Sequence, residues 1–308
     1  MGFLYILEDL RVPFLTELML AVTKLGEETA FLVIALIVFW CVDKRRGYYL
    51  MAVGFTGTIL NQMVKLSCRI PRPWVLDPEF TIVEQAREAA AGYSFPSGHT
   101  QFAVGTFAAL GRTCKKRWIK CICITCAVLV PFSRMYLGVH TLKDVLVGTL
   151  MAGTLVAVFQ PLVFSEKKDA MKLLIGGMIA LAVVFVLYVE FWPFPVELDA
   201  YNYESGLKNA YTMLGCLIGV AIVYVADEKW LHFPVEAKWW VQIIKSVVGL
   251  GPVLIVKSVL KAPLDALLGG HMAARGLRYF LVVVTAGVIW PMSFQKLAKL
   301  GWKSTEEV

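Results

Sequence analysis

Long uninterrupted apolar blocks constrain this chain more than any other feature. Clear examples are Phe31–Val42, Met171–Trp192 and Tyr279–Trp290. The hydrocarbon core of a bilayer is crossed by a helix of roughly 20 predominantly apolar residues. The blocks mix Leu, Ala and Gly with Val and Ile, and they lack the two-residue alternation of membrane β-barrel strands. The sequence therefore predicts an all-α fold, a polytopic helical bundle integral to a membrane.

The composition supports this prediction. Of the 308 residues, 58% are hydrophobic and 17% are charged, and the mean hydropathy is +0.67. Soluble domains are about 45–50% apolar and about 25% charged. Hydropathy predicts about nine spans, near residues 29–42, 47–64, 99–111, 118–133, 142–164, 171–192, 209–226, 239–257 and 277–293. The amphipathic start, Met1–Lys24, is compatible either with a helix in the membrane interface or with a poor first span.

The basic residues, which give a net charge of +7, gather in alternate loops between the apolar blocks. These clusters are Lys44, Arg45 and Arg46; Arg112, Lys115, Lys116, Arg117 and Lys120; Lys167, Lys168 and Lys172; and Lys296, Lys299 and Lys303. Cytoplasmic loops of membrane proteins carry such an excess. The positive net charge therefore does not indicate a nucleic-acid partner. We expect a multi-pass protein of a bacterial plasma membrane, with the loops 65–98, 133–141, 193–208 and 264–275 outside. The sequence indicates no oligomeric state.

Polar residues at span ends are informative because charge in a membrane is costly and is usually functional. Three clusters lie on the expected outer side. The first holds Lys65 and Arg72, although interfacial anchoring is an alternative for these two alone. The second opens a span with Ser97, Gly98 and His99, and the backbone N–H groups of a helix start form a ready anion site.

The third cluster runs from Ser133 and Arg134 to His140 and Asp144. On a helix, His140 and Asp144 would share a face. A carboxylate on one imidazole nitrogen leaves the other nitrogen free to attack. Taken alone, a structural His–Asp pair is an equal alternative. Taken together, the clusters offer cations, an anion-binding helix start, a nucleophile and a second histidine, which is the set that phosphoryl transfer requires.

The three clusters resemble the motifs of the type-2 phosphatidic acid phosphatase family, which shares its site with vanadium haloperoxidases. That pattern consists of Lys, six residues and Arg-Pro; then Pro-Ser-Gly-His; then Ser-Arg, five residues, His, three residues and Asp. Every fixed position is matched, by Lys65, Arg72, Pro73, Pro96, Ser97, Gly98, His99, Ser133, Arg134, His140 and Asp144. The resemblance covers roughly Gly47 to Phe164. Longer family members also carry extra C-terminal helices.

The resemblance and the chemistry together imply a role for each matched residue. His140 is expected to attack phosphorus while Asp144 orients its ring. His99 is expected to protonate the leaving group and later to activate water. The expected phosphate-binding residues are Lys65, Arg72, Ser97, Gly98 and Arg134. No metal and no cofactor are expected, because Asp144 is the sole carboxylate within these motifs and is committed to His140.

The expected substrate is a lipid phosphate or pyrophosphate that enters from the bilayer, of the isoprenoid, glycerolipid or sphingoid class. A lipid phosphotransferase that uses the same site is the nearest alternative. A phosphate-selective transporter is a weaker one, because few charges lie inside the spans, Lys245 being the main one. We expect a membrane phosphatase core over residues 1–166. Residues 167–308 are then C-terminal membrane helices whose role the sequence does not indicate.

Overall fold

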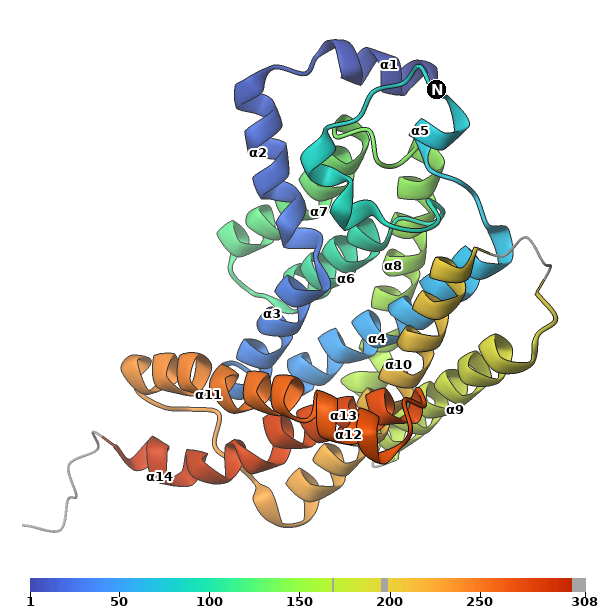
Figure 1. The fold of residues 1–308 in the computed structure, drawn as a ribbon. Coiled ribbons are helices and arrows are strands. Elements are labelled where there is room, and N and C mark those ends of the chain that lie inside the picture. The colour runs from blue at the N-terminus through green and yellow to red at the C-terminus, as the bar shows by residue number, and fades with distance from the viewer. Residues whose placement is uncertain (168, 195–198, 301–308) are drawn as a thin grey trace, which may run out of the picture.

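The chain folds into helices and turns, as predicted. The computed structural model describes residues 1–167, 169–194 and 199–300, and no β-strand occurs among them (Figure 1). The helices are α1 (Gly2–Asp9), α2 (Pro13–Thr23), α3 (Glu28–Cys41), α4 (Lys44–Cys68), α5 (Pro73–Leu76), α6 (Gly98–Thr113), α7 (Arg117–Tyr136), α8 (Leu142–Val163), α9 (Ala170–Phe191), α10 (Ala200–Ala226), α11 (Trp239–Val259), α12 (Lys261–Leu267), α13 (Ala273–Val284) and α14 (Phe294–Lys299). The all-α prediction is confirmed.

Fewer helices qualify as membrane spans by length and composition than the sequence predicts. Within the described residues, six helical segments are long and apolar enough to cross a membrane: α7, α8, α9, and the continuous stretches Ala200–Leu231, Trp239–Leu267 and Ala273–Lys299. The apolar helix α3 has only 14 residues. The predicted spans at 47–64 and 99–111 form α4 and α6, which do not meet the same criterion. The count of about nine is therefore not confirmed.

The central helix α4 shows why hydropathy is a weak guide here. Every residue from Gly47 to Ile59 is buried, although the helix is only weakly apolar overall. A helix enclosed by other helices needs no lipid-facing apolar surface, and small residues let its neighbours approach. A Cβ at Gly54 would lie 2.1 Å from the ring of Phe31. The helix ends at Arg69, whose φ is +51°.

The segment Met1–Lys24 forms α1 and α2, of 8 and 11 residues. At 1.5 Å per residue these are about 12 and 16 Å long, too short to cross a bilayer. The alternative of a first span is therefore wrong. Between the two helices, Arg11 donates its Nε to the carbonyl of Tyr136 at 3.0 Å and its Nη1 to that of Thr81 at 2.9 Å. These bonds hold the segment over α7 and the loop that follows α5.

The loops with basic clusters meet at one end of the bundle. Lys44 at the start of α4 pairs with Asp227 after α10 at 2.8 Å, and Lys172 in α9 lies 3.8 Å from Glu228. The opposite end of α4 meets the starts of α6 and α8. Lys168 and Lys303 of the predicted basic set lie outside the described residues. The motif loops are thus at the end of the bundle opposite Lys44 and Lys172.

The helices after α8 pack against the core chiefly through α10, which lies between α4 and α13. A Cβ at Gly215 would lie 2.0 Å from the carbonyl oxygen of Gly276, so α10 and α13 meet backbone to backbone. The indole of Trp40 in α3 donates to the carbonyl of Ala286 at 2.9 Å. Core and extension therefore form one packed body, with the extension in the lower half of Figure 1.

Candidate active site

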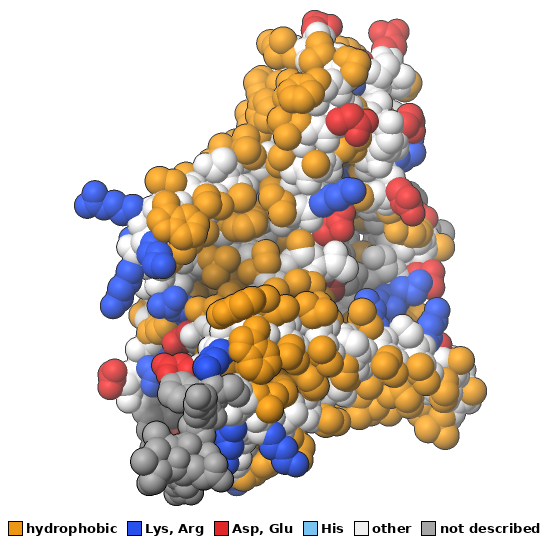
Figure 2. All heavy atoms as spheres, turned by 90° about the vertical axis from the view of Figure 1, so that its left-hand side faces the viewer, with side chains coloured by type: hydrophobic (Ala, Val, Ile, Leu, Met, Phe, Trp, Pro, Cys, Tyr) orange, Lys and Arg blue, Asp and Glu red, His pale blue; other side chains and the backbone are white. Residues whose placement is uncertain are grey.

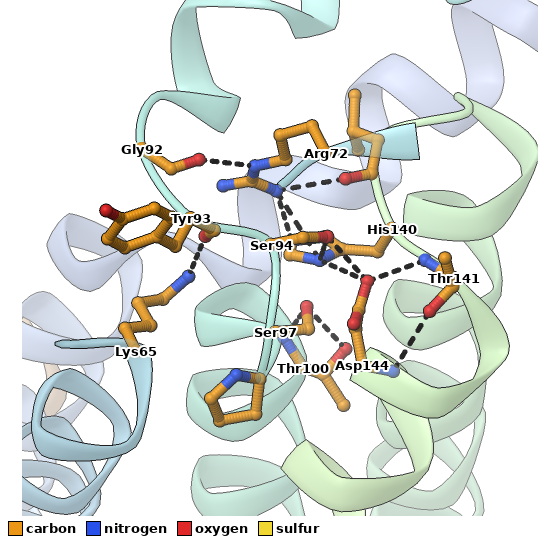
Figure 3. A network of polar contacts seen from close by, with 12 residues as sticks. Lys65, Arg72, Gly92, Tyr93, Ser94, Ser97, Thr100, His140, Thr141 and Asp144 are labelled. Carbon is orange, nitrogen blue, oxygen red and sulfur yellow. Dashed lines mark hydrogen bonds and ion pairs between the residues drawn. The ribbon is translucent and has the colours of Figure 1, made fainter. Parts of the chain in front are cut away.

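The three motif clusters converge on one cavity of about 150 Å³ (Figure 3). Five of the eight predicted site residues line it: Lys65, Arg72, Gly98, His99 and His140. They come from the end of α4, the loop that follows it, the start of α6 and the loop before α8. Ser97, Arg134 and Asp144 do not line the cavity. Ser97 caps the helix that begins at Gly98, and Asp144 lies 3.4 Å from His140 Nδ1.

The start of α6 is positioned by its first residues. Ser97 is the N-cap, and its Oγ accepts hydrogen bonds from the amide of Thr100 at 3.4 Å and from the hydroxyl of Thr100 at 2.9 Å. The amide of Ser97 donates to the carbonyl of Asp144 at 3.0 Å, which joins the starts of α6 and α8. N-cap hydroxyls satisfy the first amides of a helix. The Ser97 hydroxyl therefore helps to fix Gly98 and His99 at the cavity wall.

The guanidinium of Arg72 is held in place by carbonyl groups. Its Nε donates to Gly92 at 2.9 Å, its Nη2 to Ala91 at 3.1 Å and its Nη1 to Val139 at 2.9 Å. Burial lowers the pKa of Arg72 to about 10, so the side chain stays charged at neutral pH. Nη1 also lies 2.9 Å from Nε2 of His140. Because a charged guanidinium only donates, Nε2 accepts, and we assign the imidazole proton to Nδ1.

His140 and Asp144 meet in a way that differs from the prediction. His140 precedes α8, Thr141 is the N-cap, and Asp144 completes a capping box by accepting from the amide of Thr141 at 2.7 Å. His140 Nδ1 and Asp144 Oδ2 are 3.4 Å apart. The expectation that the two residues share a helix face is therefore wrong, because the helix begins between them. The carboxylate serves the helix start and the imidazole together.

Ser94 is a site residue that the sequence reasoning missed. Its hydroxyl donates to Asp144 Oδ2 at 2.6 Å and lies 3.4 Å from His140 Nδ1, and the residue is fully buried. It lies three residues before Ser97, and this proximity to the second cluster is the one signal for it in the sequence. Figure 3 shows Ser94 beside the imidazole and above the carboxylate.

The electrostatics of the cavity favour a neutral His140. Burial lowers the pKa of His140 well below its ordinary value of 6.5, and the positive charges of Arg72, Arg134 and Lys65 lower it further. Desolvation and like charge both disfavour an imidazolium. A neutral imidazole retains the lone pair that a nucleophile needs.

Three residues at or beside the cavity, Gln101, Arg134 and His99, have buried polar atoms without partners among the residues that the structure describes. Gln101 lines the cavity, and neither its Nε2 nor its Oε1 has a partner. Arg134 is fully buried and donates Nη1 to the Thr23 hydroxyl at 2.8 Å, but its Nε and Nη2 have no partner. The Nε2 of His99 also has none. Lys65 donates to the carbonyl of Tyr93 at 2.5 Å. Unpaired buried donors are rare, and an unfilled ligand site is one explanation.

The described ranges contain no cluster of side chains suited to bind a metal ion. No group of three His, Cys, Asp or Glu side chains comes together there as a set of metal ligands. The arrangement of the site instead gathers fixed N–H donors and two imidazoles around one small cavity.

Comparison with known proteins identifies both halves of the chain. Residues 45–168 match the model of the PAP2 superfamily, and residues 211–303 match that of the PAP2 superfamily phosphatase transmembrane extension. Phosphatidylglycerophosphatase B of Bacillus subtilis is 29% identical over 155 residues, which are 45% of this chain and 70% of that protein.

An undecaprenyl-diphosphatase of Sulfolobus acidocaldarius is 29% identical over 143 residues, 46% of this chain and 67% of the relative. Sphingosine-1-phosphate phosphatase 1 of Rattus norvegicus is 27% identical over 181 residues, 55% of this chain and 41% of the relative. No solved structure gives a significant match. With both models matched in order along one chain, this protein belongs to the PAP2 superfamily of phosphatases, in a form that carries the transmembrane extension.

Proposed function

We propose that this protein hydrolyses a lipid phosphate or lipid pyrophosphate through a phosphohistidine intermediate on His140. One observation carries the proposal: His140 and His99 line the same cavity as Lys65 and Arg72. Relatives named for three lipid classes, a glycerolipid, an isoprenoid and a sphingoid, support a lipid substrate. The apolar helices that embed the site support the same class.

In the first step, Nε2 of His140 attacks phosphorus and the bond from phosphorus to the leaving oxygen breaks. The Nδ1 proton faces Asp144, whose carboxylate offsets the positive charge that develops on the ring. His99 donates a proton to the leaving oxygen. Burial and the nearby cations lower the pKa of His99, and the negative charge of the bound phosphate offsets those cations, so the ring is protonated in the complex. Lys65, Arg72 and the unpaired N–H groups of Arg134 stabilise the charge on the phosphoryl oxygens.

In the second step, water attacks the phosphorus of the intermediate and the bond between nitrogen and phosphorus breaks. His99, now neutral, accepts a proton from this water, as microscopic reversibility requires. Phosphate leaves and Nε2 regains its lone pair. Each atom and proton is accounted for without a metal ion, so we infer a metal-independent reaction.

We infer that the site faces away from the cytoplasm. The basic loops that include Lys44 and Lys172 gather at the other end of the bundle, and such loops are cytoplasmic in membrane proteins. A lipid phosphate in the outer leaflet then reaches the cavity without crossing the bilayer. The core over residues 1–166 carries every proposed site residue, and residues 167–308 carry none.

The test measures phosphate release by the purified protein in detergent, across isoprenoid, glycerolipid, sphingoid and water-soluble phosphates, with and without a chelator. A radiolabelled substrate quenched in alkali traps phosphohistidine, which is stable in base and labile in acid. Wild type is expected to label and to turn over in chelator, whereas His140→Ala is expected to do neither.

Two controls make this test decisive. His232→Ala changes a histidine in the loop before α11, far along the chain from the motifs, and is expected to leave labelling and turnover unchanged. A His140→Ala variant that elutes as folded protein yet keeps substantial activity would overturn the nucleophile assignment. Loss of turnover in chelator would overturn the metal-free step alone, and transfer of phosphate to an added alcohol in place of water would indicate a phosphotransferase.

A further inference from the structure

A second cavity, of about 160 Å³, lies between the core and the C-terminal helices. Its walls come from α3 and α4 on one side and from α10, α11 and α13 on the other, and they are almost wholly hydrophobic. Typical wall residues are Leu36, Met51, Val220, Leu250 and Val283. We call this cavity the groove. On the side of the molecule where α3 and α11 lie, Figure 2 shows hydrophobic side chains above and below a recess at mid-height.

The groove has one charged end and one apolar end. Its charged wall residues are Glu28, the first residue of α3, and Lys257, in the last turn of α11. The far end is formed by Phe39 of α3 and Tyr48 of α4, near the basic loops. This polarity runs in the same direction as that of a lipid whose headgroup lies at the level of the catalytic cavity.

The charged end adjoins the catalytic cavity. Gly26, two residues before Glu28, packs against His99: a Cβ there would lie 2.8 Å from the His99 carbonyl oxygen and 3.1 Å from its Cβ. The helix α3 therefore begins beside His99. Glu28, which lines the groove, is thus two residues from a residue that contacts His99, which lines the catalytic cavity.

A single aromatic layer separates the two cavities further down. Phe31 stacks on Phe102 with ring centroids 5.4 Å apart, and it meets Phe55 edge-on at 6.1 Å. Phe102 lines the catalytic cavity and Phe55 lines the groove. The walls of both cavities are thus parts of one packed aromatic cluster.

We propose that the groove holds a hydrocarbon chain of the lipid whose phosphate occupies the catalytic cavity. This inference rests on the proposed function. Phosphate and chain are then held on the two sides of Phe31, and the C-terminal helices gain a role, because α10, α11 and α13 supply half of the groove. Burial of apolar chain is favourable in proportion to its length, and each buried methylene raises affinity about fourfold.

The test compares two tryptophan substitutions in α11. Leu250 lines the groove, whereas Val247 is 67% exposed on the same helix and does not. The kcat/KM is measured in one detergent for phosphates of a homologous series of alkyl chains and for p-nitrophenyl phosphate. In wild type and in Val247→Trp, kcat/KM is expected to rise with chain length until the groove is filled.

In Leu250→Trp the rise is expected to stop earlier. Displacement of about two methylenes from the groove predicts a loss of about fifteenfold for the longest chains. No loss is expected for p-nitrophenyl phosphate. Leu36→Trp on the opposite wall, in α3, is expected to give the same pattern and guards against a folding defect peculiar to α11.

Three results separate the outcomes. Equal slopes with chain length in all variants, with short substrates still cleaved, would overturn the groove while leaving the phosphatase assignment intact. A change in thermal stability without a change in slope would mean that bulk membrane lipid fills the groove, which also overturns the proposal. Failure of wild type to release phosphate from any substrate would overturn the proposed function and the groove's role with it.

Discussion

Two buried cations, one in each half of the molecule, differ in how far their N–H groups are hydrogen-bonded. Arg134 in α7 and Lys245 in α11 are both fully buried. The ammonium of Lys245 donates to the carbonyls of Pro234 and Val235 at 3.0 and 3.1 Å and faces the ring of Phe294. The guanidinium of Arg134 leaves Nε and Nη2 without partners among the described residues.

This difference separates a structural charge from one that awaits a ligand. Burial of an unpaired charged donor costs free energy. We therefore expect such a donor to have a function that offsets this cost. Lys245 ties the loop after α10 to α11, because two of its three N–H groups donate to carbonyls of that loop. Arg134 and the unpaired Nε2 of His99 lie beside a cavity that suits a phosphoryl group.

The comparison of the two cations predicts a large effect on catalysis at Arg134. Arg134→Met removes a phosphate-binding cation, and loss of one such donor costs about 3–4 kcal/mol of transition-state stabilisation, or about 10²–10³ in kcat/KM. The unfolding temperature is expected not to fall, because an apolar side chain replaces an unpaired buried charge. Steady-state kinetics and thermal unfolding in detergent measure the two quantities. A marked loss of stability with activity intact would make Arg134 a structural residue like Lys245.

His99→Ala tests whether the other unpaired group is the general acid. General acids contribute roughly 10²–10⁴ in rate, and the contribution shrinks as the leaving group becomes more acidic. The loss of kcat is therefore expected to be large for an alkyl phosphate and small for p-nitrophenyl phosphate. The ratio of the two rates in the variant and in wild type measures it. Equal losses for both substrates would contradict the assignment.

Lys245→Met is expected to act on stability alone. The substitution leaves the carbonyl of Pro234 without its side-chain donor, whereas the carbonyl of Val235 still accepts from Gln242 Nε2 at 2.8 Å. One unpaired buried carbonyl costs about 1–3 kcal/mol in the free energy of unfolding. The kcat/KM is expected to stay within about twofold of wild type, because no catalytic contact changes. Denaturation in mixed micelles gives the free energy. A large fall in kcat/KM without unfolding would link the C-terminal helices to the chemistry.

Ser94→Ala tests a positioning residue that acts through Asp144. Its hydroxyl donates to the carboxylate at 2.6 Å, and a hydrogen bond to a charged group is worth about 1.5–3 kcal/mol. We expect kcat to fall about tenfold with little change in KM, because the carboxylate orients the nucleophile and does not bind substrate. Ser94→Thr, which keeps the hydroxyl, is expected to recover part of the loss. An increase in KM alone would point to a role in binding.

The smallest effect concerns pH. Because burial and nearby cations lower the pKa of His140, protonation should reduce kcat/KM only below pH 6.5. Arg134 is one of those cations, so Arg134→Met should raise this pKa and move the acid limb upward, still below 6.5 because burial remains. The same substrate in both proteins cancels the ionisation of the substrate itself. A downward shift would contradict the charge argument.

The sequence alone determined the helical membrane character. It also predicted that the motif loops lie on one side and which of their residues form the site. Hydropathy and charge alternation are local properties, and the motif residues stand next to span ends that hydropathy locates. The sequence therefore predicts one site for these motif residues. Five of them line a single cavity in the structure: Lys65, Arg72, Gly98, His99 and His140.

Only the tertiary structure decided how these residues are held. The start of α8 falls between His140 and Asp144, and Ser94 reaches the carboxylate from 50 residues earlier in the chain. The burial of α4, the unpaired nitrogens of Arg134 and the groove depend on helices far apart in sequence. Hydrogen bonding and burial of a side chain depend on the residues that pack against it from other helices and loops. The local sequence pattern does not specify those residues.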